Sequence, residues 1–251
     1  MLHYNREKEA DIRFQDGSLR HVKGVLCYQV HRANGQYTYN HAPMIACWKG
    51  RFFIEYLSNK QSEHVPPSRT FLTWSKNGYD WADPQEVFPE IKVPSNLYKG
   101  IGKEYLREEE TPCIMHQRMG FYVSANKRLY VMGFYGISPK PNIAPNKGYG
   151  VGRVIREIKE DLTWSNIYFI YFNEAVGFTR ENTKAFPIYT ESNDEEFIGD
   201  CNEILNHPLV IKQWWEEQRY EAIFQGGEER EAFSIIPVHR ERFTDFIKMD
   251  M

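Results

Sequence analysis

The sequence predicts a mainly β fold, an antiparallel β-propeller whose ring is incomplete within these 251 residues. Aromatic residues make up 15% of the chain, and aromatic side chains favour pleated, half-buried strands. Short apolar runs broken by turn residues continue from Lys23 to about Tyr189. A hairpin module recurs in this stretch, and modules that cannot bury both faces alone are usually arranged radially as blades.

The first module follows the lead-in "KGVLCYQVH" and contains "APMIACWKGRFFIEYLS", two apolar runs joined at Lys49-Gly50, which is a hairpin signal. "RTFLTWSKNGYDW" predicts a third strand ending in an Asn-Gly turn. This turn resembles the Asp-box of sialidase-like propellers, in the form Ser-x-Asp/Asn-Gly-x-x-Trp, matched by Ser75, Asn77, Gly78 and Trp81. Its role is structural, because Asn77 bonds its own turn and Gly78 supplies a positive φ. We expect it at the end of the blade opposite the functional site.

A second module has two strands in "MGFYVSANKRLYVMGFYG", joined through Ala125-Asn126-Lys127, and a third in "VGRVIREIK" after a loop rich in Pro and Gly. A weaker third module is expected to begin at "NIYFIYFN". The glycines of "GYGVGRV" imitate a phosphate-binding loop, but such a loop follows a strand and opens a helix. Here a Pro-rich loop precedes and a β-like run follows, so nucleotide binding is disfavoured.

Residues 193–218 break the strand pattern. Apolar residues recur at helical spacing behind an Asn193-Asp194 cap, and Pro208 opens a second segment at a favoured first-turn position. We therefore expect a helical hairpin at about 194–218, inserted before strand character resumes at "REAFSIIPV". The prediction for residues 1–251 is a single, partial propeller domain.

Composition excludes several partners. The formal net charge of -3 and the pI near 6.3 give no basic field, which makes a nucleic-acid partner unlikely. No run approaches the roughly 18 apolar residues of a membrane span, and the N-terminus lacks an apolar signal segment. The sequence alone thus predicts a soluble chain without an export signal. The four cysteines, three of them in apolar runs, are expected to be buried free thiols: Cys27, Cys47, Cys113 and Cys201.

Polar residues at the mouths of strands are the candidate site. His41 precedes "APMIA", His64 lies in the hairpin loop "SEHVPPS", and "MHQRMGF" places His116 and Arg118 before the corresponding strand of the second module. Equivalent strand starts meet at one end of a propeller, where ligand sites form from loops on a rigid scaffold. Neighbouring loop or strand-start positions hold Tyr39, Asn40, Arg69 and Arg153. The alternative is that each histidine only caps a strand or satisfies a buried carbonyl.

The stretches "YNHAPMIACWKGRFFIEYLSNKQSEHVPPSRTFLTWSKNGYDW" and "MHQRMGFYVSANKRLYVMGFYG" resemble the propeller rhamnose-α-1,4-glucuronate lyases and, more distantly, the propeller α-rhamnosidases. The resemblance covers roughly residues 22–172. It implies a glycan substrate containing uronic acid, His41 and His64 as proton-transfer residues, and Arg118 and Arg153 as carboxylate ligands. It also names calcium as the candidate cofactor and implies that relatives are largely exported. The chain departs from the family because it lacks a signal peptide and is too short to close six or seven blades.

The chemistry of such a lyase suits these residue types. Elimination removes the C5 proton of glucuronate and protonates the O4 leaving group, and it needs a cation beside the carboxylate. Histidine suits the two proton transfers, with His116 as a further candidate. Bidentate arginine suits the role of the cation beside the carboxylate. Tyr39, Tyr122 and Tyr135 are candidates to pack on the sugar. Hydrolysis of the same terminal sugar and glycan binding without catalysis remain alternatives.

Overall fold

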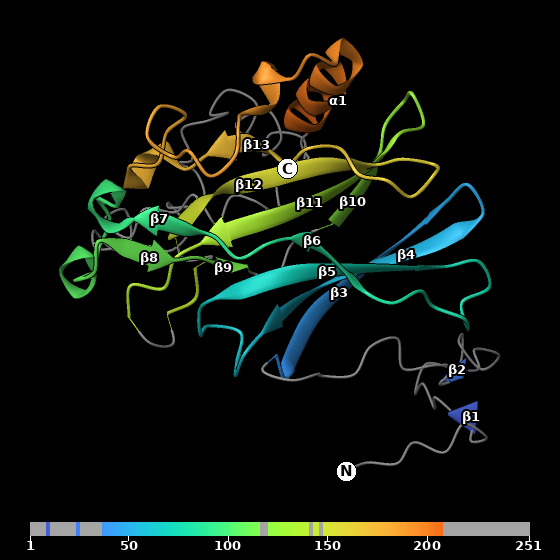
Figure 1. Ribbon diagram of the computed structural model, residues 1–251, viewed down its shortest axis with the longest axis horizontal. Coiled ribbons are helices and arrows are strands. Elements are labelled where there is room, and N and C mark those ends of the chain that lie inside the picture. The colour runs from blue at the N-terminus through green and yellow to red at the C-terminus, as the bar shows by residue number, and fades with distance from the viewer. Residues whose placement is uncertain are drawn as a thin grey trace, which may run out of the picture.

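The computed structural model describes residues 9–10, 24–25, 37–115, 120–140, 143–145 and 148–207. The prediction of a mainly β, antiparallel protein is confirmed for them (Figure 1). Their strands form a four-stranded sheet, a five-stranded sheet and two short two-stranded sheets, in which every pairing is antiparallel. No helix within these ranges is long and apolar enough to cross a membrane.

The four-stranded sheet is the first blade. Its strands follow chain order from one edge of the sheet to the other: β3 (Tyr39–Trp48), β4 (Arg51–Asn59), β5 (Ser68–Ser75) and β6 (Gln85–Phe88). Lys49 and Gly50, with φ of 45° and 72°, form the expected turn between β3 and β4. Positive φ at both central residues is the requirement of a tight turn whose twist matches its strands. The hairpin predicted from Lys49-Gly50 is thus confirmed.

The five-stranded sheet is the second blade. Its strands are β9 (Ile114–Met115), β10 (Gly120–Val123), β11 (Leu129–Gly136), β12 (Gly150–Ile158) and β13 (Tyr168–Phe172). Both β9 and β10 pair with β11, through Met115 opposite Tyr135 and Gly120 opposite Met132, so together they form one side of the blade. The glycine-rich run is strand β12, as predicted. "NIYFIYFN" contains β13, which pairs with β12 and completes this blade, so the expectation of a third module there is wrong.

The remaining elements are short. They are the strands β1 (Glu9–Ala10), β2 (Gly24–Val25), β7 (Lys92–Pro94) and β8 (Glu110–Pro112), and the 3-10 helices η2 (Ser95–Leu97), η3 (Lys103–Tyr105), η4 (Glu174–Val176) and η5 (Tyr189–Glu191). β1 pairs with β2, and β7 pairs with β8. The second two-stranded sheet lies in the connection between the blades and contributes Val93 to the main core.

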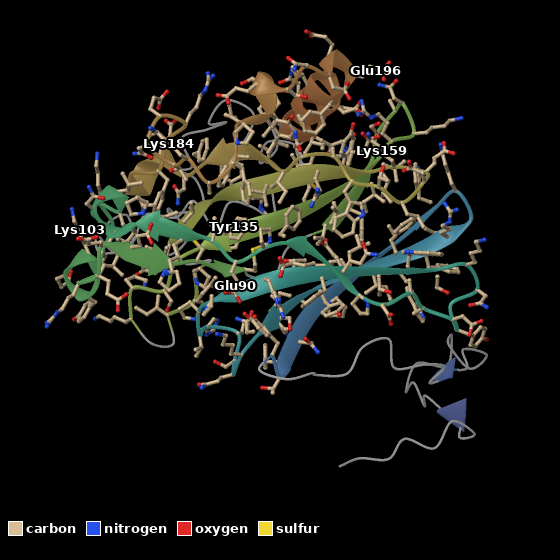
Figure 2. All side chains as sticks on the ribbon, in the orientation of Figure 1. Glu90, Lys103, Tyr135, Lys159, Lys184 and Glu196 are labelled. Carbon is tan, nitrogen blue, oxygen red and sulfur yellow. The ribbon has the colours of Figure 1, made fainter. Side chains whose placement is uncertain are left out.

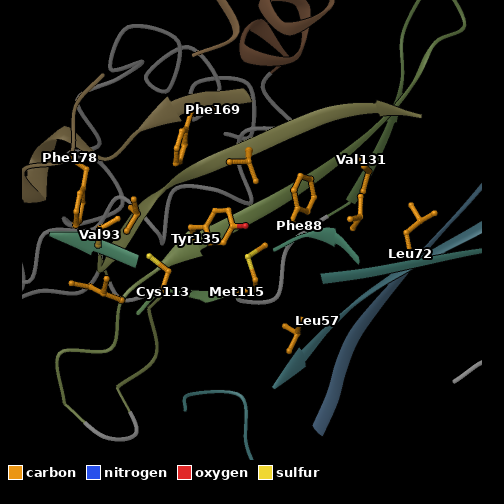
Figure 3. Packing of buried hydrophobic residues seen from close by; sticks show 14 of the residues in the cluster. Leu57, Leu72, Phe88, Val93, Cys113, Met115, Val131, Tyr135, Phe169 and Phe178 are labelled. Carbon is orange, nitrogen blue, oxygen red and sulfur yellow. The ribbon is translucent and has the colours of Figure 1, made fainter. Parts of the chain in front are cut away.

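The main hydrophobic core includes side chains from both blades. Leu57, Leu72 and Phe88 of the first blade belong to the same buried cluster as Val131 and Tyr135 of the second (Figure 3). Figure 2 shows Tyr135 inside the molecule and Lys159 and Glu196 at its periphery. A Cβ added to Gly133 would lie 2.8 Å from both Phe88 Cδ2 and Met115 Cε. Glycine at this position therefore allows the close approach of the two blades.

The helix α1 (Glu195–Asn206) covers the second blade on its other face (Figure 1). Phe197, Cys201 and Ile204 pack there with Tyr130 and Met132 in a second buried cluster. The first half of the predicted helical hairpin is confirmed. Its second half, from Pro208, and the strand predicted at "REAFSIIPV" lie outside the described residues. The blades described here form no closed ring.

Two of the cysteine predictions are confirmed and one is wrong. Cys113 and Cys201 are buried free thiols, and burial raises the pKa of both. Cys47 is free but exposed, because it lies on β3, where alternate residues point away from the core. Cys27 lies outside the described residues.

The charge of Asp194 is expected to stabilise the start of α1. Its Oδ1 accepts from the N–H of Phe197 at 3.0 Å, and Arg128 donates to both of its carboxylate oxygens. The hydrogen bond from Arg128 is the main cause of the lowered pKa of Asp194. A lowered pKa stabilises the fold above the unfolded value of about 3.9, and this contribution is lost as pH falls through the folded value.

Asp194→Asn keeps a capping side chain but removes the charge. We expect the variant to be less stable at pH 7 by about 0.3–1 kcal/mol, a small value because the Asp194 side chain is 47% exposed and screened by solvent. Thermal unfolding followed from pH 7 downward measures the deficit, which should shrink below about pH 4 as Asp194 is protonated. A deficit independent of pH would show that the charge is not its cause.

The Asp-box turn has the predicted geometry. Gly78 has a φ of 77°, Asn77 Oδ1 accepts from the N–H groups of Tyr79 and Asp80 at 2.9 Å each, and the Trp81 indole donates to the Gly78 carbonyl at 3.0 Å. We expect Asn77→Ala to lower the free energy of unfolding by about 1–2 kcal/mol, because two N–H groups lose their acceptor. Urea unfolding measures the loss, and Lys76→Ala is the control in the same turn. An equal loss in both variants would contradict this role.

The second blade has a related turn that the motif did not reveal. Trp164 forms an isolated bridge with Ile158, as Trp81 does with Ser75 in the first blade. Leu162 has a φ of 68° in this turn. Because Ile158 and Asp161 stand where the motif requires Ser and Gly, the sequence pattern fails there although the tryptophan bridge is kept.

Candidate functional site

The candidate site lies at the end of the first blade where β3 begins and β4 ends. His41 on β3 is opposite Leu57 on β4, and the 60–67 loop that follows β4 carries His64. At the other end of the same strands, Phe52 is opposite Ser75 of the Asp-box turn. The turn and His41 are therefore at opposite ends of the blade, as predicted.

His41 and His64 both lie close to the carboxylate of Glu63, a residue that the sequence pattern did not indicate. The Nε2 atom of His41 lies 3.5 Å from Glu63 Oε1, and Nε2 of His64 lies 3.8 Å from Glu63 Oε2. The three side chains are 37%, 28% and 19% exposed for His41, His64 and Glu63 respectively. A carboxylate within 4 Å of two partly exposed imidazoles is an arrangement suited to proton transfer. We call these three residues the histidine–glutamate cluster.

A bulge in β3 determines where His41 lies. The register of β3 against β4 shifts between His41 and Met44, and Ala42 has a φ of 50°. Positive φ is uncommon for a residue with a Cβ, and a bulge bends its strand and redirects a side chain.

Tyr39 lies beside the cluster. Its ring centroid is 5.7 Å from that of His41. Burial and, to a smaller degree, the negative charge of Glu63 raise the pKa of Tyr39. Its hydroxyl therefore stays protonated at neutral pH and is a potential hydrogen-bond donor at the edge of the site.

Two other predicted residues lie on the opposite face of the first blade. Asn40 is opposite Ser58, and Ser58 is opposite Arg69, so the three share a face that alternates away from that of Tyr39 and His41. Asn40 Oδ1 accepts from the Ser58 hydroxyl at 2.7 Å, and Arg69 donates to Glu86 at 3.0 Å. The structure therefore does not bring Asn40 and Arg69 together with the histidines, because a strand alternates its faces.

Arg153 is fully buried on β12. Its guanidinium carbon lies 5.7 Å from the centroid of the Phe134 ring. Burial raises the pKa of Glu55, another fully buried residue, well above its usual value, and the charge of Arg153 opposes this rise. A guanidinium in the interior is not accessible to a substrate, so this structure does not support Arg153 as a ligand of an external carboxylate.

Two tyrosines proposed to pack on sugar have other contacts. Tyr135 is fully buried, and its hydroxyl donates to the carbonyl of Pro89. Tyr122 donates to Glu203 of α1 at 2.7 Å. Burial excludes Tyr135 from contact with a substrate, and Tyr122 lies under α1 rather than beside the histidines. Of the three tyrosines, Tyr39 is the one beside the cluster.

His116 and Arg118 lie outside the described residues, so their place in the site stays a prediction. The described chain comes close to them at Met115. The Met115 carbonyl accepts from the Ser68 hydroxyl at 3.4 Å, and the Met115 N–H donates to the Ser68 hydroxyl oxygen. Ser68 begins β5 of the first blade. These bonds connect the second blade to the first near its histidine-bearing end.

The sequence contained one signal for Glu63, its position directly before His64 in "SEHVPPS". Its proximity to His41 depends on the β3–β4 pairing and was not visible in the pattern. In the part of the chain that the structure describes, no group of three or more His, Cys, Asp or Glu side chains is arranged to hold a metal ion. Calcium therefore remains an expectation from the resemblance alone.

The solved structures similar to this chain include the following three. One named "Sialidase" has 46% sequence identity and a TM-score of 0.67, and the match covers 75% of this chain and 18% of that one. A xylan β-1,4-xylosidase from Bacillus halodurans C-125 has 14% identity, a TM-score of 0.34, and coverage of 56% and 22%. A Trypanosoma rangeli sialidase in complex with sialic acid has 11% identity, a TM-score of 0.31, and coverage of 67% and 24%.

No curated protein matches the chain. A family model described as "Beta-prop_BT_1020:-like, N-terminal beta propeller" matches residues 1–229. The antiparallel blades and the Asp-box turn agree with that description, and the match covers most of the 251 residues. This chain therefore belongs to the family of BT_1020-like N-terminal β-propellers.

Proposed function

We propose that this chain provides part of a catalytic centre that hydrolyses the bond to a terminal acidic sugar of a glycan. The observation that carries the proposal is the histidine–glutamate cluster, in which one carboxylate lies within 4 Å of two partly exposed imidazoles. Further support comes from the propeller family and from the name of the 46% identical chain, "Sialidase". The match spans 18% of that chain's length.

Hydrolysis needs an acid and a base within reach of one bond. A protonated member of the cluster gives its proton to the glycosidic oxygen as the bond to the sugar breaks. A second member takes a proton from the water that attacks the anomeric carbon, so the cluster ends with the number of protons it had. Glu63 suits either role because a carboxyl group can accept or give a proton, and its negative charge stabilises a positive imidazole beside it.

Elimination is the second candidate, in the form of a lyase that acts on terminal rhamnose linked to glucuronic acid. It is favoured by the presence of two imidazoles, one to take the C5 proton and one to protonate O4 of the leaving group. It also needs a cation at the uronate carboxylate. Arg153 is buried and Arg69 lies on the other face, which leaves Arg118 as the predicted ligand.

The two reactions differ in their products. We expect the chain, incubated separately with a sialylated glycan and with a rhamnose-capped arabinogalactan, to release the terminal acidic sugar of the first without new ultraviolet absorbance. Release together with ultraviolet absorbance would indicate an unsaturated uronate and hence elimination. Binding of the glycan with no released sugar would contradict both reactions and favour a non-catalytic glycan-binding propeller.

A further inference from the structure

A row of three residues crosses the first blade at the end that carries the histidine–glutamate cluster. Tyr39 on β3 is opposite Asn59 on β4, and Asn59 is opposite Ser68 on β5. Directly opposite residues in adjacent strands share a face of the sheet. Asn59 and Ser68 are fully buried although both are polar. Each side chain forms a hydrogen bond to main-chain atoms of a segment outside the first blade's sheet.

Asn59 holds the main chain of the 60–67 loop, which carries Glu63 and His64. Its Nδ2 donates to the carbonyl oxygen of Glu63 at 3.0 Å. Its Oδ1 is buried and has no hydrogen-bond partner among the residues that the structure describes. A buried acceptor without a partner costs stability, whereas an apolar residue of the same shape would not. The Asn59 amide therefore makes one hydrogen bond, to the main chain of the 60–67 loop, and leaves its own oxygen unpaired.

Ser68 extends the row to the second blade. Its hydroxyl donates to the carbonyl of Met115 and accepts from the N–H of the same residue. Met115 is the last residue of β9. The row thus connects three segments: the strand β3 that carries His41, the loop that carries Glu63 and His64, and the strand β9 of the second blade.

We propose that Asn59 is a positioning residue for Glu63, and that Ser68 fixes the second blade to the same row. The proposal rests on the proposed function insofar as Glu63 takes part in proton transfer. Distances of 3.5 and 3.8 Å to two imidazoles depend on where the Glu63 main chain lies. Small displacements of a catalytic group have large effects on rate. The Asn59 amide fixes this main chain directly.

Asn59→Leu is the test, because leucine has a similar volume and no hydrogen-bonding group. We expect the imidazole resonances of His41 and His64 to shift in NMR spectra, since Glu63 moves relative to both rings. The resonances are assigned with His41→Gln and His64→Gln. On a glycan that the chain cleaves, kcat should fall by about tenfold to a hundredfold with KM little changed. The midpoint of thermal unfolding should change little, because removal of the unpaired acceptor offsets the lost hydrogen bond to the Glu63 carbonyl.

Ser58→Ala is the matched control. Ser58 is the neighbouring residue on β4, is equally buried, and makes its hydrogen bond to Asn40 on the opposite face. Ser58→Ala should leave the imidazole resonances of His41 and His64 unshifted. Asn59→Ala repeats the test with a smaller side chain in case the leucine variant does not fold.

Unshifted imidazole resonances in folded Asn59→Leu or Asn59→Ala would overturn the proposal. A large fall in the unfolding midpoint of the leucine variant would also overturn it, since that result assigns Asn59 to folding. If the wild-type chain cleaves no glycan, the proposed function fails, but the NMR comparison still decides whether Asn59 positions Glu63.

Discussion

Glu63→Gln is expected to lower kcat at least about a hundredfold on any glycan that the chain cleaves, because general acid–base catalysis typically contributes that much or more. Glutamine keeps the shape of the side chain but neither exchanges a proton nor balances the charge of a protonated imidazole. Glycan binding should be largely retained, because the change removes a proton-transfer group rather than a contact surface. Steady-state kinetics together with glycan-binding titrations measure the two effects separately.

Glu160→Gln is the matched control for this experiment. Glu160 is a surface carboxylate, 66% exposed, whose partner Lys49 lies in the hairpin turn at the other end of the first blade. Glu160→Gln should leave kcat unchanged.

His41→Ala and His64→Ala are each expected to resemble Glu63→Gln, and the effects of combined substitutions should be less than additive because the three residues act as a unit. Undiminished turnover in Glu63→Gln would exclude the histidine–glutamate cluster as the catalytic centre.

Phe88→Ala is expected to lower the free energy of unfolding by about 3–5 kcal/mol, the usual cost of removing a fully buried phenylalanine side chain. Phe88 is completely buried in the core shared by the two blades and lies against Gly133 of the second one. The variant leaves a cavity where the blades meet, and the close contact at Gly133 limits how far they can relax to fill it. Chemical denaturation monitored by tryptophan fluorescence measures the loss.

Phe88→Leu is the control for the size of the cavity, since it retains most of the apolar volume and should cost clearly less. The unfolding transition in Phe88→Ala should remain single, because both blades share this core. Two separate transitions would show that the blades unfold independently and would contradict a shared core.

The predictions that succeeded rest on signals that act over a few residues. The Lys49-Gly50 turn and the Asn77-Gly78 turn follow from backbone geometry that glycine and asparagine adopt readily. The start of α1 follows from the Asp194 cap and the apolar spacing behind it. The opposite placement of the Asp-box turn and His41 also follows from chain order, because each strand of an antiparallel blade reverses direction.

The sequence did not show which side of a strand a candidate residue faces or what covers it. Asn40 and His41 are neighbours in sequence but lie on opposite faces of β3. Arg153 was a candidate because of its strand-start position, but packing of the second blade buries it completely. The second tryptophan turn was missed because Ile158 and Asp161 replace the Ser and Gly of the motif, and the positive φ there belongs to Leu162.

The sequence by itself determined the antiparallel strands, their turns, the helix at 195–206 and the histidines at one end of the first blade. These features depend on local backbone preferences and on the alternation of apolar residues, which one sequence contains. Only the tertiary structure decided that Glu63 lies between His41 and His64 and that Asn59 holds the main chain of Glu63. Those contacts depend on the register of β3 against β4 and on the bulge at Ala42, and register is set by packing between distant segments.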